Sequence, residues 1–77
     1  MLTITRPATP VAFSGDRLRA LRHARKINRT RLAFALGTAE GTIGRWERGE
    51  SEPTATHLLT LARILQCRPE AFTTTTS

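Results

Sequence analysis

The sequence predicts an all-α protein, a compact bundle of five short helices. Three observations support this fold class. Apolar residues recur at helical spacing along most of the chain, residues that cap helices precede several of these stretches, and glycine or proline follows them. The length of 77 residues suits one domain, which would bury about 60% of its unfolded surface.

The two ends of the chain differ from the rest in composition. Residues 1–12 contain Pro7 and Pro10 and keep no periodicity, so they are predicted to be a flexible arm. Residues 13–72 hold all the predicted helices. Residues 73–77, a polar threonine-rich stretch, are predicted to be a disordered tail, and no strand is expected anywhere.

The first helix is expected to begin after Ser14, whose hydroxyl can accept an N–H of the first turn. Leu18, Leu21 and Ala24 fall on one face and are predicted to be its inner stripe. Its other face is strongly basic, with Arg17, Arg19, Arg22, Arg25 and Lys26. A charged run of this kind is equally typical of a merely solvated surface.

Two short helices joined by a tight turn are predicted next. Asn28 can cap the first, and Gly37 can adopt the left-handed conformation that ends it. The second helix would end at Gly49, with Ile43 and Trp46 on its inner side. Its opposite side presents Glu40, Gly41, Gly44, Arg45 and Arg48. This arrangement is typical of a helix-turn-helix, whose second helix fits the major groove of DNA.

A fourth helix is predicted to start after Thr54 as its cap. Its inner stripe is expected to comprise Leu58, Leu61, Ala62 and Leu65. The segment 67–72 is predicted to be a fifth short helix with Pro69 at its first position, where a missing N–H costs nothing.

Charge points to a polyanionic partner. Twelve Lys and Arg residues against six Asp and Glu give a net charge of +6, which favours nucleic acid through counterion release. All but one of the twelve are arginine, a residue that can make forked contacts to phosphate or guanine.

Other function classes find little support. Cys67 is the single cysteine, and His23 and His57 are too scattered for a metal or catalytic site, so both are expected to face solvent. No nucleophile–base pair, carboxylate dyad or phosphate-cradling loop is recognisable. We therefore expect a non-enzymatic protein without cofactor or metal. With no signal peptide or membrane span recognisable, we expect it in the cytoplasm, associated with the nucleoid.

The region from Ser14 to Phe72 resembles a known family, the lambda-repressor and Cro-like, or Xre-type, helix-turn-helix regulators. The resemblance is carried by Leu32-Ala33, Leu36-Gly37, Thr42-Ile43, Arg45-Trp46-Glu47-Arg48-Gly49, Ser51 and Pro53. It implies a sequence-specific regulator of transcription, most simply a repressor, that binds double-stranded DNA.

The resemblance also implies roles for individual residues. Arg22 would form a partly buried ion pair with Glu47. Arg29, at the start of the second helix, would contact a phosphate or a base edge. The base-reading positions of the third helix, about residues 39–48, map onto Glu40, Gly41, Thr42 and Arg45.

Their chemistry suggests specific pairings. Arg45 can donate two hydrogen bonds to guanine, a contact that discriminates by about 1–3 kcal/mol. Glu40 can accept from cytosine, and Thr42 can touch a thymine methyl group. The predicted phosphate contacts come from Asn28, Arg31, Arg48 and Lys26, together with backbone N–H groups after Gly49.

Members of the resembled family bind as homodimers to operators whose two half-sites lie about 34 Å apart. Leu59, Ile64 and Phe72 are apolar beyond the needs of the inner stripe and are candidates for the dimer contact.

The sequence departs from the family pattern in the third helix. Ala39 stands at the cap position, where serine is common, so Thr38 would cap one residue early or the helix would fray. Gly41 and Gly44 each cost up to about 1 kcal/mol relative to alanine and leave no side chain to meet a base. Either the helix backbone approaches the bases closely, or the helix reads poorly and another surface acts.

The second case leads to the alternative function, a protein-interaction module such as an antitoxin or an antagonist of a related repressor, with a regulatory protein as partner. Trp46 is predicted to lie in the core because it shares a face with Ile43. Phe34 is compatible with either the core or a partner surface.

Overall fold

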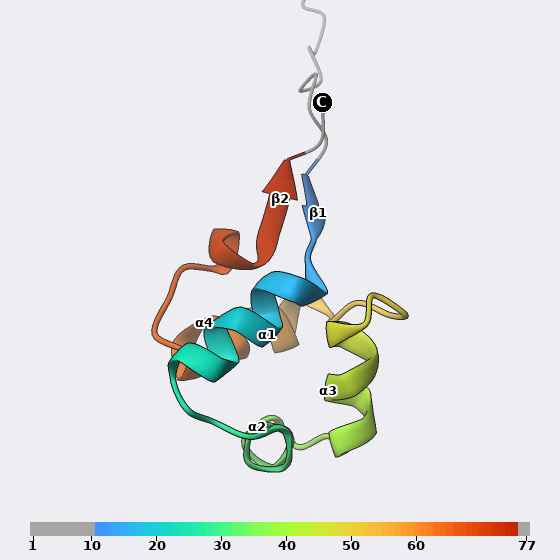
Figure 1. Ribbon diagram of the computed structural model, residues 1–77, viewed down its shortest axis with the longest axis vertical. Helices are drawn as coiled ribbons and strands as arrows, with labels where there is room; N and C mark the ends of the chain where they lie inside the picture. Colours follow the sequence, from blue (N-terminus) through green and yellow to red (C-terminus); the bar gives the residue numbers. More distant parts are fainter. Residues whose placement is uncertain (1–10, 76–77) are drawn as a thin grey trace, which may run out of the picture.

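The computed structural model of the protein describes residues 11–75, so the predictions for residues 1–10 and 76–77 lie outside it. Four α-helices and one 3-10 helix form the bundle, with a small two-stranded sheet at its edge (Figure 1). In chain order the elements are β1 (Val11–Phe13), α1 (Gly15–Ala24), α2 (Arg29–Leu36), α3 (Glu40–Glu47), α4 (Ala55–Ile64), the 3-10 helix η1 (Pro69–Phe72) and β2 (Thr73–Thr75).

The helices begin where the sequence predicts caps. The Ser14 hydroxyl accepts from the Arg17 N–H at 3.2 Å, and the side-chain amide oxygen Oδ1 of Asn28 accepts from the Arg31 N–H at 2.8 Å. The Thr54 hydroxyl accepts from the His57 N–H at 3.3 Å. Each bond satisfies a donor that the first helical turn leaves without an intrahelical partner.

The bundle has four α-helices, and the fifth short helix that the sequence predicts is not one of them. Residues 69–72 form a single 3-10 turn instead, with Pro69 at its start. A turn this short has room for few hydrogen bonds, and the tighter 3-10 geometry is common in such pieces.

One hydrophobic core joins all the helices. Its fully or almost fully buried apolar residues are Leu18, Leu32, Ala33, Ile43, Trp46, Leu61, Ala62, Leu65 and Phe72. Leu21 and Leu58 pack against it partly buried, whereas Ala24 is exposed and does not belong to the inner stripe of α1.

The two strands correct the prediction of a strand-free protein with a tail from residue 73. β1 and β2 pair antiparallel, with Ala12 opposite Thr74 and Phe13 opposite Thr73. The Ser14 N–H continues this pairing by donating to the Phe72 carbonyl at 2.7 Å. Buried Phe72 fixes the start of β2 beside β1, and threonine favours the extended backbone.

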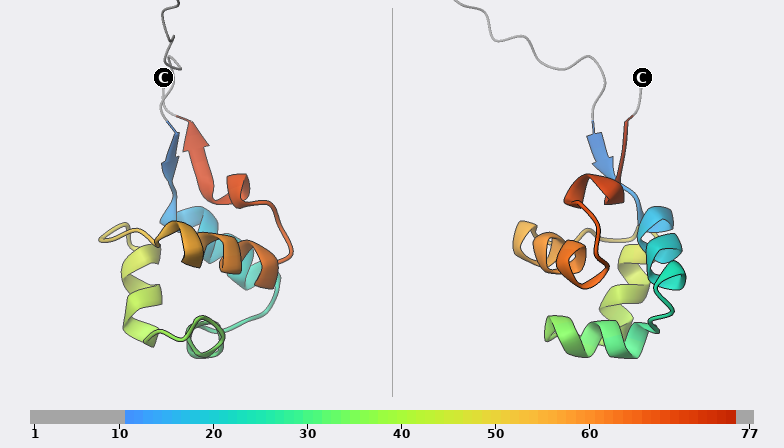
Figure 2. Two further views of the ribbon diagram at one scale, coloured as in Figure 1. Left: turned by 180° about the vertical axis from the view of Figure 1, so that it is seen from behind. Right: turned by 90° about the vertical axis from the view of Figure 1, so that its left-hand side faces the viewer.

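The helices pack as a ring around the core, and the β1–β2 ribbon leaves the bundle at the end opposite α2 (Figures 1 and 2). The axes of α2 and α3 cross steeply, and Gly37 closes α2 with a left-handed φ of 70°. Within residues 11–75, no helix is both long and apolar enough to cross a membrane.

Candidate nucleic-acid interface

The outer face of α3 is a ridge of exposed positions at one flank of the bundle (Figure 1). Glu40, Gly41, Arg45 and Arg48 are all exposed, and Thr42 is half-buried. Glu40, Gly41, Gly44, Arg45 and Arg48 stand at i, i+1, i+4, i+5 and i+8, a spacing that places them on one side of the helix. We call this side, Glu40, Gly41, Gly44, Arg45 and Arg48, the outer ridge.

The opposite face of α3 is fixed to the bundle. Ile43 is fully buried, and Trp46 is 3% exposed. Gly15, the first residue of α1, lies so close to the carbonyl groups of Trp46 and Glu47 that a Cβ atom would overlap them. Glycine at position 15 thus lets α1 approach the last turn of α3, and it is a positioning residue that the sequence analysis did not identify.

Glu47 is the centre of a charged cluster between α1, α2 and α3. Arg22 Nε donates to Glu47 Oε2 at 2.6 Å, and Arg22 Nη2 donates to Oε1 at 3.2 Å. Arg22 Nη1 also donates to the Ile27 carbonyl at 2.9 Å. The structure therefore contains the expected ion pair and ties it to the loop before α2.

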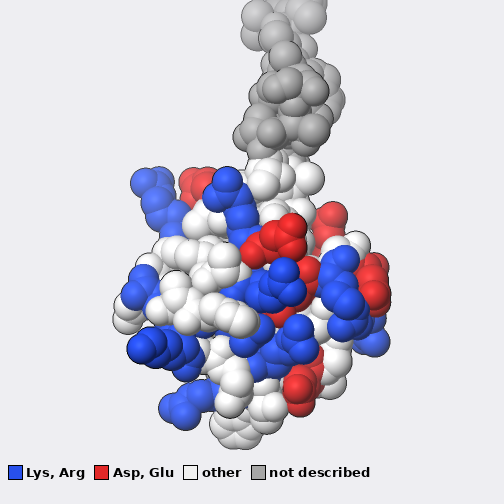
Figure 3. Space-filling model, viewed as in Figure 1, with Lys and Arg blue, Asp and Glu red and all other residues white. Residues whose placement is uncertain are grey.

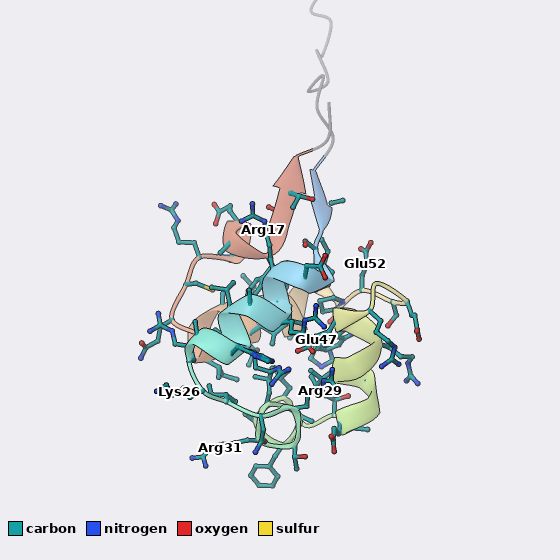
Figure 4. All side chains as sticks on the ribbon, viewed as in Figure 1. Arg17, Lys26, Arg29, Arg31, Glu47 and Glu52 are labelled. Carbon is teal, nitrogen blue, oxygen red and sulfur yellow. The ribbon has the colours of Figure 1, made fainter. Side chains whose placement is uncertain are left out.

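Arg29 is a second partner of the same carboxylate. Its Nε donates to Glu47 Oε1 at 3.1 Å, and its side chain is 37% exposed. Figure 4 shows Arg29 and Glu47 directed into the space where the helices meet. The sequence analysis gave Arg29 only a DNA contact, because its partner is remote in sequence.

The cluster affects the titration of Glu47. Burial by itself raises the pKa of this carboxyl, but the hydrogen bonds and charges of Arg22 and Arg29 outweigh burial and hold the pKa below its ordinary value of 4.5. Glu47 is therefore ionised at neutral pH, and two arginines balance it.

The amino-terminal end of α3 depends on a side-chain contact with α2. Ala39 occupies the cap position and makes no side-chain hydrogen bond to the helix. The Thr30 hydroxyl donates instead to Glu40 Oε1 at 2.9 Å. This bond links the two helices and orients a predicted base-reading residue, while the Glu40 carboxylate still lies near the positive end of α3.

Arg48 lies at the other end of the outer ridge, where it pairs with Glu50. Its Nε donates to Glu50 Oε2 at 2.8 Å, and both side chains are about half exposed. This hydrogen bond raises the pKa of Arg48 and lowers the pKa of Glu50. Gly44, which the sequence places on the outer face, is nevertheless buried because the Arg48 side chain covers it.

Comparison with known proteins identifies the family. The family model described as helix-turn-helix matches residues 18–72. This chain belongs to the Xre-type helix-turn-helix regulators. It is 41% identical to repressor protein C2 of Salmonella phage P22 over 56 residues, which are 73% of the chain and 26% of that relative. It is 42% identical to the regulator DicA of Escherichia coli over 55 residues, 71% of the chain and 41% of that relative.

Solved structures agree with this assignment. The P22 c2 repressor protein in complex with a synthetic operator superposes with a TM-score of 0.73 and 38% identity, over 79% of this chain and 92% of that one. The match to the two curated relatives covers less than half of their length.

The other predicted phosphate contacts of this helix-turn-helix protein lie on the surface near the start of α2. Lys26, Asn28 and Arg31 are exposed, and Figure 4 shows Lys26 and Arg31 pointing outward from the bundle. Lys and Arg cover much of the face formed by α1 and the start of α2, with fewer acidic residues among them (Figure 3).

Arg25, from the predicted basic face, has a structural role. Its Nε donates to the Leu65 carbonyl at 2.8 Å, and its Nη2 donates to the Gln66 carbonyl at 3.1 Å. It therefore caps the carboxyl-terminal end of α4, where a cation also complements the helix dipole. Sequence spacing gave no signal for this contact.

The structure corrects the predicted dimer surface and the predicted exposure of one histidine. Phe72 is fully buried, so it belongs to the core and not to a dimer surface. Leu59 is 58% exposed, and Ile64 is half-buried against the core. His57 is not free in solvent as predicted but packs on Trp46, with ring centroids 5.4 Å apart.

Phe34 is 87% exposed, which excludes it from the core. Cys67 packs partly buried against the core, and burial raises the pKa of its thiol. Within residues 11–75, no three His, Cys, Asp or Glu side chains lie together in a way that could hold a metal ion.

Proposed function

We propose that this protein is a sequence-specific repressor of transcription that places α3 in the major groove of double-stranded DNA. It acts without catalysis or a cofactor, on the DNA of the cytoplasmic nucleoid. It binds as a homodimer to an operator whose half-sites lie about 34 Å apart.

The observation that carries this proposal is the contrast between the two sides of α3. Its inner side is buried in the core and held by Arg22, Arg29 and Gly15, whereas its outer ridge is exposed and bears Arg45 and Arg48. A fixed helix with an exposed cationic edge is what reading a groove requires. The similarity to the P22 repressor, solved with an operator, supports the same use.

The proposal assigns roles along this surface. Arg45 contacts guanine, Glu40 accepts from cytosine, and Thr42 contacts a thymine methyl group or a phosphate. Gly41, which has nothing within 4 Å of an added Cβ, lets the backbone approach the base edges. Phosphates are held by Lys26, Asn28, Arg31 and Arg48, and Arg29 contributes its exposed edge.

The dimer contact is assigned to α4. Leu59 is the more exposed of the two remaining candidates, and Ile64 lies five residues further along the same helix. A dimer contact here would shield the exposed Leu59 side chain from water. Sedimentation at increasing concentration tests the assignment, and Leu59→Glu should shift the equilibrium toward the monomer.

The decisive experiment is selection of bound sequences from a pool of random duplexes. We expect one enriched sequence with two related half-sites, and an affinity that falls with salt by about 0.9 logarithmic units per phosphate contact per tenfold rise in concentration. Arg45→Ala should remove the preference at one base pair in each half-site. Arg68→Ala removes the same charge from an exposed loop position and should leave every preference intact.

A protein-interaction module is the second candidate, and one observation favours it. Phe34 lies at a surface pocket of about 590 Å³ whose other lining residues are Asn28, Thr30, Arg31 and Ala35. An exposed aromatic beside a pocket is typical of a partner surface. Failure to enrich any duplex, together with tight capture of one protein that Phe34→Ala abolishes, would favour this function over DNA binding.

A further inference from the structure

The side chain of Arg48 lies back over the outer ridge instead of extending away from it. A Cβ atom built at Gly44 would stand 3.1 Å from Arg48 Nη1 and 3.8 Å from Arg48 Cζ. Gly44 is buried as a result, although Gly41 and Arg45 on the same ridge are exposed. The guanidinium therefore lies directly beside the place where a side chain of residue 44 would begin.

Two features of the chain produce this placement. Long side chains on a helix lean toward its amino-terminal end and cover the residue four positions earlier, and the glycine at position 44 leaves that space open. The second feature is Glu50, which accepts from Arg48 Nε at 2.8 Å and from Nη2 at 3.4 Å. It holds the guanidinium along one edge.

The other edge of the guanidinium keeps its donors. The group has five N–H bonds, and Glu50 engages only Nε and Nη2. Nη1, the nitrogen nearest Gly44, donates no hydrogen bond within residues 11–75. One N–H on each terminal nitrogen can thus point outward together, the geometry that pairs with O6 and N7 of guanine.

We propose that Arg48 is a specificity-determining residue that contacts a guanine base in place of the missing side chain at position 44. This inference rests on the proposed function, because it assumes that the outer ridge enters the major groove. It changes the role of Arg48 from a phosphate contact, which carries no sequence information, to a base contact. It also gives Gly44 a role, since a Cβ at position 44 would lie 3.1 Å from Arg48 Nη1 and the guanidinium would have to shift.

Two glycine variants provide a matched test. Gly44→Ala and Gly41→Ala both replace a glycine on the outer ridge of α3, and both raise helix propensity. Only the alanine at position 44 would meet the Arg48 guanidinium, because nothing lies within 4 Å of a Cβ at position 41. Arg48→Lys completes the set by keeping the charge while removing the fork. Thermal unfolding should show all three variants folded.

The measurement is the relative affinity for a panel of duplexes in which each base pair of the selected half-site is changed in turn. We expect Arg48→Lys and Gly44→Ala to lose about tenfold of discrimination at the same guanine position. Gly41→Ala adds a methyl group at the proposed interface, so it should weaken binding to all duplexes alike, but it should keep the discrimination at that position. The full panel is measured at two salt concentrations so that phosphate contacts are counted separately.

Several results would overturn the inference. A uniform loss of affinity for Arg48→Lys over the whole panel would return the residue to a phosphate contact. A Gly44→Ala variant that keeps the discrimination at this guanine, as Gly41→Ala should, would show that the position of the guanidinium over residue 44 does not affect base selectivity. Failure of the wild-type protein to prefer any duplex would instead refute the proposed function, and the inference with it.

Discussion

Glu47, the last residue of α3, and Arg48, its C-cap, each take part in an arginine–glutamate pair, and the two pairs differ in almost every physical respect. Glu47 is 1% exposed and is held by Arg22 and Arg29 from two other helices. Arg48 pairs with Glu50, two residues away, and both side chains are about half exposed. One pair joins elements far apart in sequence, and the other joins neighbours in a loop.

Because of this difference, one short helix can be both fixed in the bundle and available to a ligand. The inner pair, Glu47 with Arg22, cannot exchange its partners for water without leaving a charge buried, so it determines where α3 lies. The outer pair, Arg48 with Glu50, loses little when it opens, because water replaces each partner. The same two residue types therefore stabilise the fold at position 47 and remain available for a ligand at position 48.

The largest expected effect comes from breaking the inner pair. Arg22→Ala removes the donor that reaches both Glu47 and the Ile27 carbonyl, so we expect a loss of about 3–5 kcal/mol in the free energy of unfolding. Denaturant titration measures it. Arg19→Ala is the control, since the partner of Arg19 is the exposed Asp16 at 3.8 Å, and the substitution should change stability little. Equal effects of the two substitutions would contradict the comparison.

Acid should weaken the inner pair gradually. The hydrogen bonds and charges of Arg22 and Arg29 outweigh burial and hold the pKa of Glu47 below 4.5 when the protein is folded, so the folded state binds fewer protons than the unfolded state. The resulting stabilisation is complete when the pH is above the ordinary pKa of a glutamate. It is lost as the pH falls through the lower pKa of Glu47 in the folded protein. The loss is smaller than for Arg22→Ala, because a protonated carboxyl still accepts hydrogen bonds.

Two measurements check this acid effect. Denaturant titrations at a series of pH values should show stability falling below pH 4.5. Carbon NMR of the Glu47 carboxyl group in the folded protein should give a midpoint below the ordinary value. A Glu47 midpoint above it would mean that burial outweighs the two arginines.

Arg29 lies between the two pairs in exposure and should have an intermediate effect. Arg29→Gln removes one charged hydrogen bond to Glu47 from a side chain that is 37% exposed, so we expect a loss of about 1 kcal/mol in unfolding free energy. If Arg29 only positions α2 against α3, its removal weakens binding to all duplexes alike. If Arg29→Gln instead loses the preference at one base pair, Arg29 makes the base contact that the resemblance implies.

The sequence predicted much of this architecture because the signals were local. Ser14, Asn28 and Thr54 cap the helices as expected, since a cap depends on residues within one turn. The inner side of α3 followed from helical spacing, and the Arg22–Glu47 pair followed from the resemblance. The outer ridge was also predicted from helical spacing. The burial of Gly44 was not, because it depends on the rotamer of Arg48, which spacing does not encode.

What the sequence missed depends on contacts between distant residues. The pairing of Phe13 with Thr73 joins the two ends of the described chain through three-residue strands, too short for an alternating pattern to be recognised. The cap of α4 by Arg25 crosses forty residues. Buried Phe72 was assigned to a dimer surface because nothing local shows that η1 turns it into the core.

A substitution in the exposed Arg48–Glu50 pair should have the least effect on stability. Glu50→Gln removes the carboxylate that holds Arg48, a contact that in the wild-type protein lowers the pKa of Glu50. We expect no measurable change in the midpoint of thermal unfolding, because water replaces the lost partner. The guanidinium should become less restrained over Gly44, so DNA selectivity can change where stability does not. A clear fall in the midpoint would mean that the outer pair also holds the fold, and the division of α3 into a structural side and a binding side would then be wrong.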